Sequence, residues 1–477
     1  MQDPLDCLRL LFQEKFGVPA RSLAPVRADA SSRKIYRLSQ GQTTAIGVLN
    51  DDARENRAFI EFSRHFRGQG IPVPDIYAEH ASGTSYLEED LGDTTLFQFL
   101  GKHRTPSGFP ENVVAAYREV VRWLPKIQIV AGRSLDDQWC YPRKSFDKQS
   151  MLWDLNYFKY YFLTLGGVAF HEERLEEDFS VFADYLLAAR KDFFLFRDFQ
   201  SRNVMLREGH PTFIDYQGGR RGALQYDIAS LLYDAKADVP FELRDELLDY
   251  YVREASQHAP IDTAEFKTFF PGFALIRIMQ AMGAYGLRGF HEKKPLFLQS
   301  IPYAIRNIEH ILLGSNLPVD VPELLAVFKR LIGTSTLRQF GSAKLKLKVR
   351  IQSFSYKDGM PADEYGHGGG FVFDCRCLPN PGRKIEFKCK SGLDADVIAY
   401  LSKEEAIDRW TRSAFALVDQ AVDDYGRRNF TDLFVAFGCT GGQHRSVYCA
   451  ERLAKHLRDQ GVQAIVSHRE TKHWPKT

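Results

Sequence analysis

The apolar positions of the first ninety residues predict a small, strand-rich lobe. A helix is expected at residues 4–17, where leucine and phenylalanine recur at helical spacing. From residue 28 the pattern changes to strands around a turn. The expected elements are two strands, a helix, an extended proline-containing segment and a further strand, at residues 35–38, 43–49, 54–66, 70–74 and 85–91.

Residues from about 94 to 332 have mostly helical periodicity, interrupted by a polar island at 197–227 and ending in a helix at 322–332. After residue 340 the pattern changes. Residues 344–351 alternate strictly between basic and apolar side chains, which predicts a strand with one basic face. Strand-like and helix-like segments then alternate to residue 477, as in an α/β domain. The expected segments are 1–93, 94–335, a linker at 336–343, and 344–477.

Composition excludes several classes of protein. The chain has 477 residues and is 44% hydrophobic, so it is neither disordered nor fibrous. No apolar run approaches the roughly 20 residues of a membrane helix. The first four residues do not resemble a signal segment, so we expect a cytoplasmic protein with no membrane partner.

The charges are balanced overall but not along the chain. There are 63 basic and 61 acidic residues, which argues against a polyelectrolyte partner for the whole chain. Residues 341–477 carry 22 basic against 17 acidic residues, so a local basic patch remains possible. The seven cysteines are expected to be free thiols. Cys375 and Cys377 are expected on one face of a strand, and their spacing does not favour a zinc site.

The polar island contains residues suited to phosphoryl transfer. This chemistry needs a carboxylate near the attacking hydroxyl and oxygen ligands that hold Mg²⁺ on the phosphates. Asp198, Asn203 five residues later, and Asp215 after a short apolar strand supply this set. We interpret Asp198 as the base, Asn203 as a metal ligand and Asp215 as the main metal ligand, with ATP and Mg²⁺ as cofactors. The alternative is that the two aspartates only cap turns.

These residues, with the segment 225–232 that follows them, resemble the aminoglycoside phosphotransferase (choline kinase-like) family over roughly residues 15–330. The segments 29–36, 197–203 and 214–217 are most similar to the anomeric N-acetylmuramate/N-acetylglucosamine kinases of cell-wall recycling. The resemblance implies a bilobal, protein kinase-like α+β fold and phosphorylation of an amino sugar. It also implies that Asp227 is a buried residue that stabilises the catalytic loop.

The sequence departs from this family at the nucleotide phosphates. Ser31, Ser32, Arg33 and Lys34 replace a glycine loop, and their amides and side chains are candidates for phosphate binding. The strand at 44–49 lacks the lysine that kinases use, so Lys34 or Arg33 is a candidate substitute. Glu55 and Glu61 are both candidates for its helix carboxylate partner. A non-catalytic kinase-like domain remains the alternative.

Two residues are further candidates for contact with the sugar. Asp154 lies in an aromatic run at 153–161 whose rings could stack on a pyranose, although packing within a helical lobe is the simpler interpretation. Arg202 lies within the 197–203 motif.

A second constellation lies near residue 440. An apolar strand at 434–437 leads into a glycine-rich loop at 438–446 and then a helix at 447–458. Backbone amides and the helix dipole converge on such a loop and form an anion site. Arg445 adds a bidentate phosphate donor, and His444 and Ser446 add further donors. The alternative is a purely structural turn.

The spacing from Cys439 to Arg445 and Ser446 also has the form of the cysteine phosphatase loop, in which an activated thiolate attacks a phosphate ester. However, Gly438 stands where those enzymes usually have histidine, and no general-acid loop can be named.

The segments 373–381, 391–394 and 437–447 are more similar to the C-terminal domain of the RapZ family, over about residues 345–470. In that family the domain binds glucosamine 6-phosphate and a small RNA. The resemblance implies a phosphosugar or anion site formed by Asp374, Arg376, Cys439, Gly441, Gly442, His444, Arg445 and Ser446. The Walker P-loop of that family is absent here.

Together these features predict a kinase-like bilobal domain followed by a separate α/β domain with a strand–glycine-rich loop–helix anion site. The first hypothesis is an ATP-dependent amino-sugar kinase joined to a sugar-phosphate-binding domain. The second is an amino-sugar-phosphate-sensing, RNA-binding regulator that uses the basic strand at 344–350. RNA is the less favoured partner, because a surplus of five charges is also typical of a solvated strand face.

Overall fold

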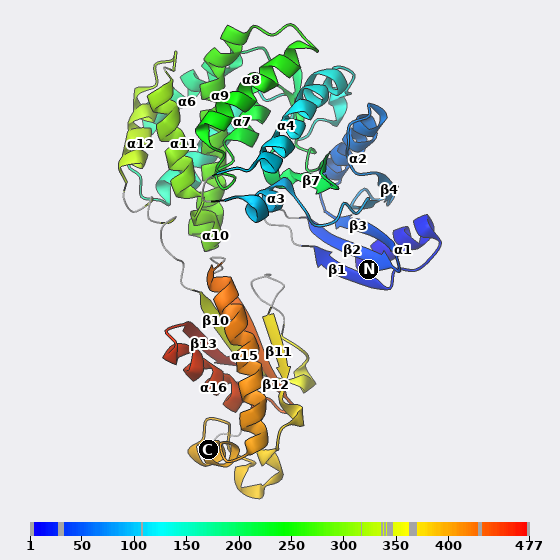
Figure 1. Cartoon of the computed structure of the whole chain (residues 1–477), viewed down its shortest axis with the longest axis vertical. Coiled ribbons are helices and arrows are strands. Elements are labelled where there is room, and N and C mark those ends of the chain that lie inside the picture. Colours follow the sequence, from blue (N-terminus) through cyan, green and yellow to red (C-terminus); the bar gives the residue numbers. More distant parts are fainter. Residues whose placement is uncertain are drawn as a thin grey trace. The chain divides into compact units, whose positions relative to one another are not determined.

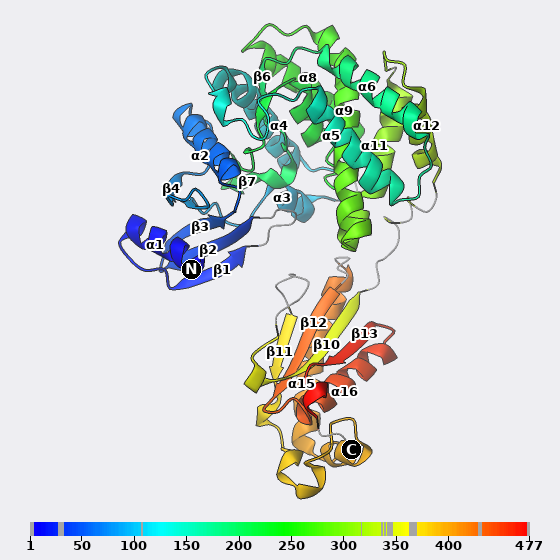
Figure 2. The same cartoon turned by 180° about the vertical axis from the view of Figure 1, so that it is seen from behind.

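The computed structural model describes residues 4–26, 33–105, 108–315, 317–334, 337, 340, 347–361, 370–427 and 432–474. The chain divides into two units, Met1–Gly341 and Ser342–Thr477 (Figures 1 and 2). Of the linker predicted at 336–343, only residues 337 and 340 are among those described. In the described part of the chain, no helix has the length and apolar character needed to cross a membrane.

The first unit begins with a five-stranded antiparallel sheet in the order β1-β2-β3-β5-β4. The strands are β1 Ser22–Val26, β2 Lys34–Gln40, β3 Thr43–Leu49, β4 Ile76–Glu79 and β5 Ser85–Glu88. The strands expected at 35–38 and 43–49 are therefore confirmed as parts of β2 and β3. The β1–β2 connection includes residues 27–32, so the predicted phosphate ligands Ser31 and Ser32 lie outside the described residues.

A helix covers each face of this sheet, as seen at the blue end of the ribbon in Figure 1. The helices are α1 Pro4–Phe16 and α2 Ala53–Gly68. Leu8 and Phe12 of α1 pack with Leu38 of the sheet, whereas α2 packs its phenylalanines on the other face. A side chain on Gly47 would clash with Leu8, so glycine in β3 permits the close approach of α1.

Helices make up most of the remainder of this unit. They are α3 Leu96–His103, α4 Glu111–Pro125, α5 Lys148–Tyr157, α6 Glu172–Leu187, α7 Gln225–Leu232, α8 Phe241–Ser256, α9 Thr263–Gly286, α10 Pro295–Leu298, α11 Ile301–Gly314 and α12 Pro322–Gly333. The long helix α9 lies among them, and a side chain on Gly286 would come within 2.0 Å of the Tyr161 carbonyl oxygen. One continuous apolar core runs through these helices and α2.

Two short antiparallel pairs interrupt the helices and carry the polar island. The strand β6 Phe193–Leu195 pairs with β9 Arg220–Gly222, and β7 Val204–Arg207 pairs with β8 His210–Phe213. The second pair is the hairpin that the sequence predicts. A strand-rich lobe followed by a helical lobe confirms the predicted α+β bilobal fold.

The second unit contains a four-stranded sheet in the order β11-β12-β10-β13, in which every pair is parallel. The strands are β10 Lys348–Ser355, β11 Gly370–Asp374, β12 Asp432–Cys439 and β13 Gln463–His468. Val349 and Ile351 of β10 are buried, as the alternation predicts, but Lys344 and Lys346 of the predicted basic face lie outside the described residues. The parallel sheet confirms the predicted separate α/β domain.

Three helices, α14 Ala395–Leu401, α15 Glu405–Arg427 and α16 Arg445–Asp459, pack against the face of the sheet that presents Val349, Ile351, Val435 and Phe437. The prediction that Cys375 and Cys377 share a face of a strand is wrong. Strand β11 ends at Asp374, whose side chain accepts a hydrogen bond from the amide of Arg376 and starts a 3₁₀ turn. Consequently Cys375 is buried, whereas Cys377 is exposed.

Candidate functional site

The loop at residues 196–203, called here the 196–203 loop, brings three of the predicted site residues together. Asp198 follows β6, and the hairpin β7–β8 connects Asn203 to Asp215. The Asn203 Nδ2 atom donates to the Asp198 carbonyl oxygen at 2.9 Å and to Asp215 Oδ2 at 3.2 Å. The amide of Asn203 therefore joins the loop to the end of the hairpin.

A buried carboxylate holds this loop. Asp227 of α7 is fully buried and accepts hydrogen bonds from the backbone amides of Phe196 at 2.7 Å and Arg197 at 2.9 Å. Gln128 Nε2 donates to the same carboxylate at 2.7 Å. Burial raises the pKa of Asp227 to about 7, although the two amides favour the ionised form.

Two non-glycine residues of the site have left-handed backbone conformations. Arg197 has φ = 84° and Asp215 has φ = 69°. Such angles are costly for residues with a Cβ atom and persist only where the surroundings impose them. Here Asp227 accepts the Arg197 amide, and Asn203 donates to the Asp215 side chain. The local backbone is thus determined by the polar network.

The Asp198 side chain is 41% exposed, so a substrate hydroxyl has access to it. Its Oδ1 atom lies 3.6 Å from Nη2 of Arg277, a buried residue of α9. Ser230 and Gln280 accept hydrogen bonds from the same guanidinium at 2.9 and 2.6 Å. Sequence reasoning missed Arg277, because nothing in the local sequence of α9 indicates that it reaches residue 198.

Of the predicted phosphate ligands, the structure describes Arg33 and Lys34, and these two side chains differ in exposure. The Arg33 side chain is only 12% exposed and forms an ion pair with Asp215, whereas Lys34 is exposed. Burial disfavours the charged guanidinium, but the Asp215 carboxylate outweighs it and raises the pKa of Arg33. Gln217 donates to the same Asp215 oxygen at 2.9 Å. Arg33 thus connects the start of β2 with Asp215.

The oxygen atoms here suit a hard divalent cation. Asn203 directs its Nδ2 atom at Asp215 and at the Asp198 carbonyl oxygen, and neither hydrogen bond uses its amide oxygen. An amide oxygen and a carboxylate, completed by nucleotide phosphates and water, are a typical ligand set for Mg²⁺. The described residues contain no cluster of three or more His, Cys, Asp or Glu side chains that would form an all-protein metal site.

Among the residues that the structure describes, neither candidate helix carboxylate pairs with a strand lysine. Glu61 forms ion pairs with Arg57 and Arg64 on the outer face of α2. Glu55 accepts a hydrogen bond from Asn50 at 2.8 Å and lies close enough to Arg33 to stabilise its charge. Glu55 is therefore the better placed of the two.

Glu88, at the end of β5, is a second acidic neighbour that sequence reasoning missed. Burial raises the pKa of Glu88 to about 8, against the opposing charge of Arg33. Its Oε2 atom is buried and has no hydrogen-bond partner among the described residues. Glu88 of β5 pairs with Ile46 of β3 in the sheet register. Strand β3 is the strand that lacks the kinase lysine.

The two further sugar-contact candidates have protein partners. Asp154 is 7% exposed and accepts two hydrogen bonds from Arg197, at 2.7 and 2.6 Å. Arg220, also buried, donates to the Gly218 carbonyl oxygen, and burial together with Arg197 lowers the pKa of Arg220 to about 10. Arg202 lies 5.1 Å from the ring centre of Phe97. Asp154 is thus a counter-ion within a buried arginine cluster.

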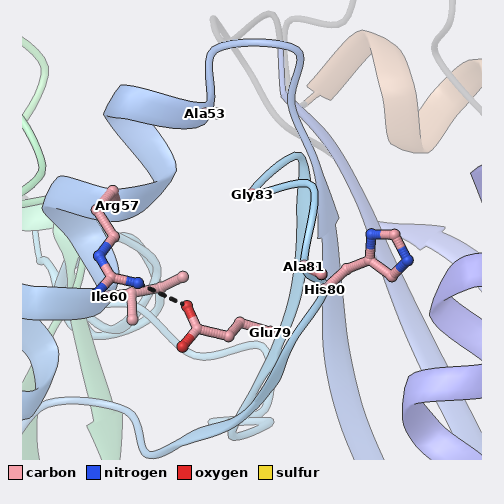
Figure 3. A pocket seen from close by; sticks show the side chains of 7 residues that line it. All are labelled: Ala53, Arg57, Ile60, Glu79, His80, Ala81 and Gly83. Atoms are coloured by element: carbon pink, nitrogen blue, oxygen red, sulfur yellow. Dashed lines mark hydrogen bonds and ion pairs between the residues drawn. The ribbon is translucent and has the colours of Figure 1, made fainter.

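A surface hollow lies on the strand-rich lobe, between α2 and the turn from β4 to β5 (Figure 3). Arg57 of α2 points across it toward Glu79, with which it forms an ion pair. None of the residues that line this hollow belongs to the predicted site, so it adds nothing to the chemistry.

The second constellation, called here the 439–446 loop, connects β12 to α16 in the second unit. Cys439 is the last residue of β12, and Arg445 is the first residue of α16. The ideal position of a Cβ atom on Gly441 has no atom within 4 Å, which indicates open space above the loop. A side chain on Gly438, by contrast, would clash with Phe354 and Tyr356, so packing requires glycine there.

Three side chains of the 439–446 loop hold a neighbouring segment. Gln443 Nε2 donates to the Lys390 carbonyl oxygen at 2.6 Å, and a ring nitrogen of His444 bonds to the Phe387 carbonyl oxygen at 2.8 Å. Arg445 Nη1 donates to the carbonyl oxygens of residues 376 and 378, both at 2.9 Å. Its Nε atom is buried and lacks a hydrogen-bond partner in the described part of the chain. His444 thus has a structural partner, whereas Arg445 keeps one unsatisfied donor.

Asp374 and Arg376 lie at the same edge of the sheet. Asp374 pairs with Gly438 in the β11–β12 register, and its carboxylate forms an exposed bidentate ion pair with Arg376. The Arg376 guanidinium also lies 3.9 Å from the ring centre of Tyr356. The carboxyl ends of the parallel strands thus bring Asp374, Arg376 and the 439–446 loop to one edge, where ligands bind in open parallel sheets.

Comparison with known proteins gives the two parts of the chain different relatives. Residues 22–266 match the model of the phosphotransferase enzyme family, and residues 347–472 match the model of the RapZ C-terminal domain. A nucleotide-binding protein of Thermotoga neapolitana is 37% identical over 142 residues, which are 30% of this chain and 47% of that protein. A nucleotide-binding protein of Nitrosococcus oceani is 39% identical over 128 residues, 27% of this chain and 44% of that protein. The chain thus spans about half the length of the curated relatives it matches.

Solved structures similar to the chain include an amicoumacin kinase in complex with AMP-PNP, Ca²⁺ and Ami, with 13% identity and a TM-score of 0.47. That match covers 68% of this chain and 97% of the kinase. An ethanolamine kinase of Plasmodium vivax has 12% identity and a TM-score of 0.42, and the match covers 61% of this chain and 82% of that protein.

The buried pair of Asp154 and Arg197 leads to a prediction about stability. Asp154→Ala leaves the Arg197 guanidinium buried without its carboxylate, so we expect the free energy of unfolding of the first unit to fall by about 3 kcal/mol. Urea denaturation followed by circular dichroism measures this. Asp184→Ala, which breaks an exposed ion pair with Lys148, is the control and should cost less than about 1 kcal/mol. A higher KM for the acceptor with unchanged stability would show that Asp154 serves the substrate instead.

Proposed function

The chain belongs to the phosphotransferase enzyme family, and on that premise we propose that it transfers the γ-phosphoryl group of ATP to a hydroxyl of an amino sugar in the cytoplasm. The acceptor is of the N-acetylmuramate or N-acetylglucosamine type, as in cell-wall sugar recycling. The observation that carries the proposal is the convergence of Asp198, Asn203 and Asp215, which are joined by the hydrogen bonds of the Asn203 amide.

Asp198 acts as the base in this proposal. Its carboxylate is accessible, and it accepts the proton of the sugar hydroxyl as that oxygen attacks the γ-phosphorus. Arg277 lies 3.6 Å away and orients the carboxylate. Asp227 acts indirectly, because it fixes the backbone that carries Asp198.

Asn203 and Asp215 are the proposed ligands of Mg²⁺, which would neutralise charge on the transferred phosphoryl group. Arg33 is the proposed substitute for the missing strand lysine. Its planar guanidinium matches phosphate oxygens, and it already reaches the Asp215 side of the site. Lys34 is exposed and has no comparable position.

The amino-sugar specificity rests on the sequence resemblance of the segments 29–36, 197–203 and 214–217 to anomeric amino-sugar kinases. The second unit, in the same proposal, binds a phosphorylated amino sugar such as glucosamine 6-phosphate at the 439–446 loop. The unsatisfied Nε donor of the buried Arg445 and the open space above Gly441 support an anion there.

Removal of the proposed base tests the first activity. We expect Asp198→Ala to lower kcat for hexosamine phosphorylation by about 10²–10⁴-fold, because the hydroxyl then lacks its proton acceptor. A coupled ATP assay over N-acetylmuramate, N-acetylglucosamine and related sugars measures this. Asp192→Ala, which removes an exposed carboxylate paired with Arg190, is the control. Absence of Asp198-dependent phosphorylation with every sugar would refute the proposal.

The different positions of Arg33 and Lys34 lead to a second prediction. Arg33→Ala should raise the KM for ATP by at least about 10-fold, since charge-assisted hydrogen bonds are worth roughly 1.5–3 kcal/mol each. Lys34→Ala should give the smaller change, because its side chain is exposed. Steady-state kinetics at saturating sugar distinguish the two. The reverse ranking would assign the nucleotide phosphates to Lys34.

Substitutions at Gly441 test the anion site proposed for the second unit. Gly441→Asp adds a carboxylate at a position where a Cβ atom has no neighbour within 4 Å, and we expect it to weaken glucosamine 6-phosphate binding by at least about 10-fold. Gly441→Ala is the matched control and should bind like the natural protein. Isothermal titration calorimetry measures both. Equal affinity of the Asp and Ala variants would place the ligand elsewhere.

A further inference from the structure

The 439–446 loop contains a sulfur atom that phosphate binding alone does not require. Cys439 lies at its base, at the carboxyl end of β12, and is only 3% exposed. The Ser446 hydroxyl lies 3.1 Å from its sulfur. The Cys439 side chain thus faces the first turn of α16, a helix of 15 residues whose N-terminal dipole favours negative charge.

The surroundings of Cys439 favour ionisation of its thiol. Burial opposes ionisation, but the Ser446 hydroxyl, the amides of Ser446 and Gln443 and the charge of Arg445 outweigh it and lower the pKa of Cys439. Cys375 lies in the same core and shows the opposite effect. Burial and the neighbouring thiol of Cys449 raise its pKa well above the usual value. Cys439 is therefore distinguished from its neighbours by its surroundings.

Arg445 supplies an independent observation that points to a ligand. Its side chain is 95% buried, and two carbonyl oxygens hold Nη1 on one side of the guanidinium. The buried Nε atom on the other side has no partner among the described residues. An unsatisfied buried guanidinium donor is costly, and a phosphate oxygen would satisfy it.

The spacing completes the constellation. Gly442 stands three residues after Cys439, with φ = 62°, and Arg445 and Ser446 stand six and seven residues after it. A turn at a left-handed glycine directs successive backbone amides toward one concave side of a loop. The loop thus combines a sulfur nucleophile, amide donors and an arginine within a single strand–loop–helix.

From this geometry we infer a second activity, hydrolysis of phosphate monoesters by the second unit with Cys439 as the nucleophile. The inference goes beyond phosphosugar binding and rests on the proposal that a sugar phosphate enters this loop. The kinase site in the first unit forms a phosphate ester, and the second unit would cleave one. The substrate class is therefore a hexosamine phosphate.

The reaction balances with water alone. The Cys439 thiolate attacks phosphorus, the bond from phosphorus to the sugar oxygen breaks, and a phosphocysteine forms. The sugar oxygen takes a proton from water, because Arg376 lowers the pKa of Asp374 and leaves that carboxyl without a proton to donate. The resulting hydroxide attacks the phosphocysteine, the sulfur–phosphorus bond breaks, and phosphate leaves. Ser446 donates to the departing sulfur in this second step.

The test uses the full chain without nucleotide and with EDTA, so that the kinase site cannot contribute. Glucosamine 6-phosphate, N-acetylglucosamine 1-phosphate and p-nitrophenyl phosphate are the substrates, and released phosphate is measured. We expect Cys439→Ser to lower turnover by at least about 100-fold while retaining sugar-phosphate binding. Cys389→Ser, which changes an exposed thiol of the same unit, is the matched control and should not alter turnover.

A second variant, Ser446→Ala, tests the inference even if Cys439→Ser does not fold. Ser446→Ala should slow the second step, so that ³²P from a labelled substrate accumulates on the protein after an acid quench. The label should be absent from Cys439→Ser. Sugar-phosphate binding without release of phosphate would overturn this inference and leave the proposed binding function intact. Failure to bind any of these ligands would overturn both. Turnover that is equal in Cys439→Ser and the natural protein would exclude Cys439 as the nucleophile.

Discussion

The Asp227 carboxylate accepts hydrogen bonds from two backbone amides, and the proposed chemistry of the first unit depends on this interaction. Asp227 is fully buried in α7, and its hydrogen bonds reach Phe196 and Arg197 at the start of the 196–203 loop. Arg197 has a left-handed backbone there, a conformation that a non-glycine residue keeps only under constraint. That conformation turns the chain so that Asp198 faces the outside while Arg197 faces the buried Asp154. The position of the proposed base therefore follows from one fully buried carboxylate.

Local patterns in the sequence predicted most of the fold. The strands β2 and β3, the hairpin β7–β8 and the helix α16 are each recognisable from periodicity and turn residues within about ten positions. The structural environment of Cys375 and Cys377 was predicted wrongly, because the capping of the Arg376 amide by Asp374 competes with continuation of the strand. Long-range contacts were beyond these patterns. Arg33 and Asp215 are separated by 182 residues, and Arg277 belongs to a helix with no sequence relation to residue 198.

The predicted loop at 438–446 illustrates the same limit in the second unit. The sequence predicted its strand–glycine-rich loop–helix form and indicated which residue types suit an anion. The sequence did not show that the side chains of His444 and Gln443 form hydrogen bonds with backbone carbonyl oxygens of a neighbouring segment. Nor did it show that Nη1 of Arg445 donates to two such carbonyl oxygens, whereas its Nε atom has no partner among the described residues. Residue type indicates which interactions are possible, whereas the tertiary structure decides which of them are already used.

The ion pair between Arg33 and Asp215 has a thermodynamic consequence for the order of ligand binding. A cation that binds the Asp215 carboxylate must first displace a guanidinium that is only 12% exposed. The displaced charge needs a new anion, and in the proposed function the nucleotide phosphates supply it. The affinities for metal and nucleotide would then be linked, and each ligand would raise the affinity for the other by the same factor. With the proposed roles of these residues, Arg33 would compete with the metal for Asp215 in the free protein, and the metal–nucleotide complex would bind in preference to the bare ion.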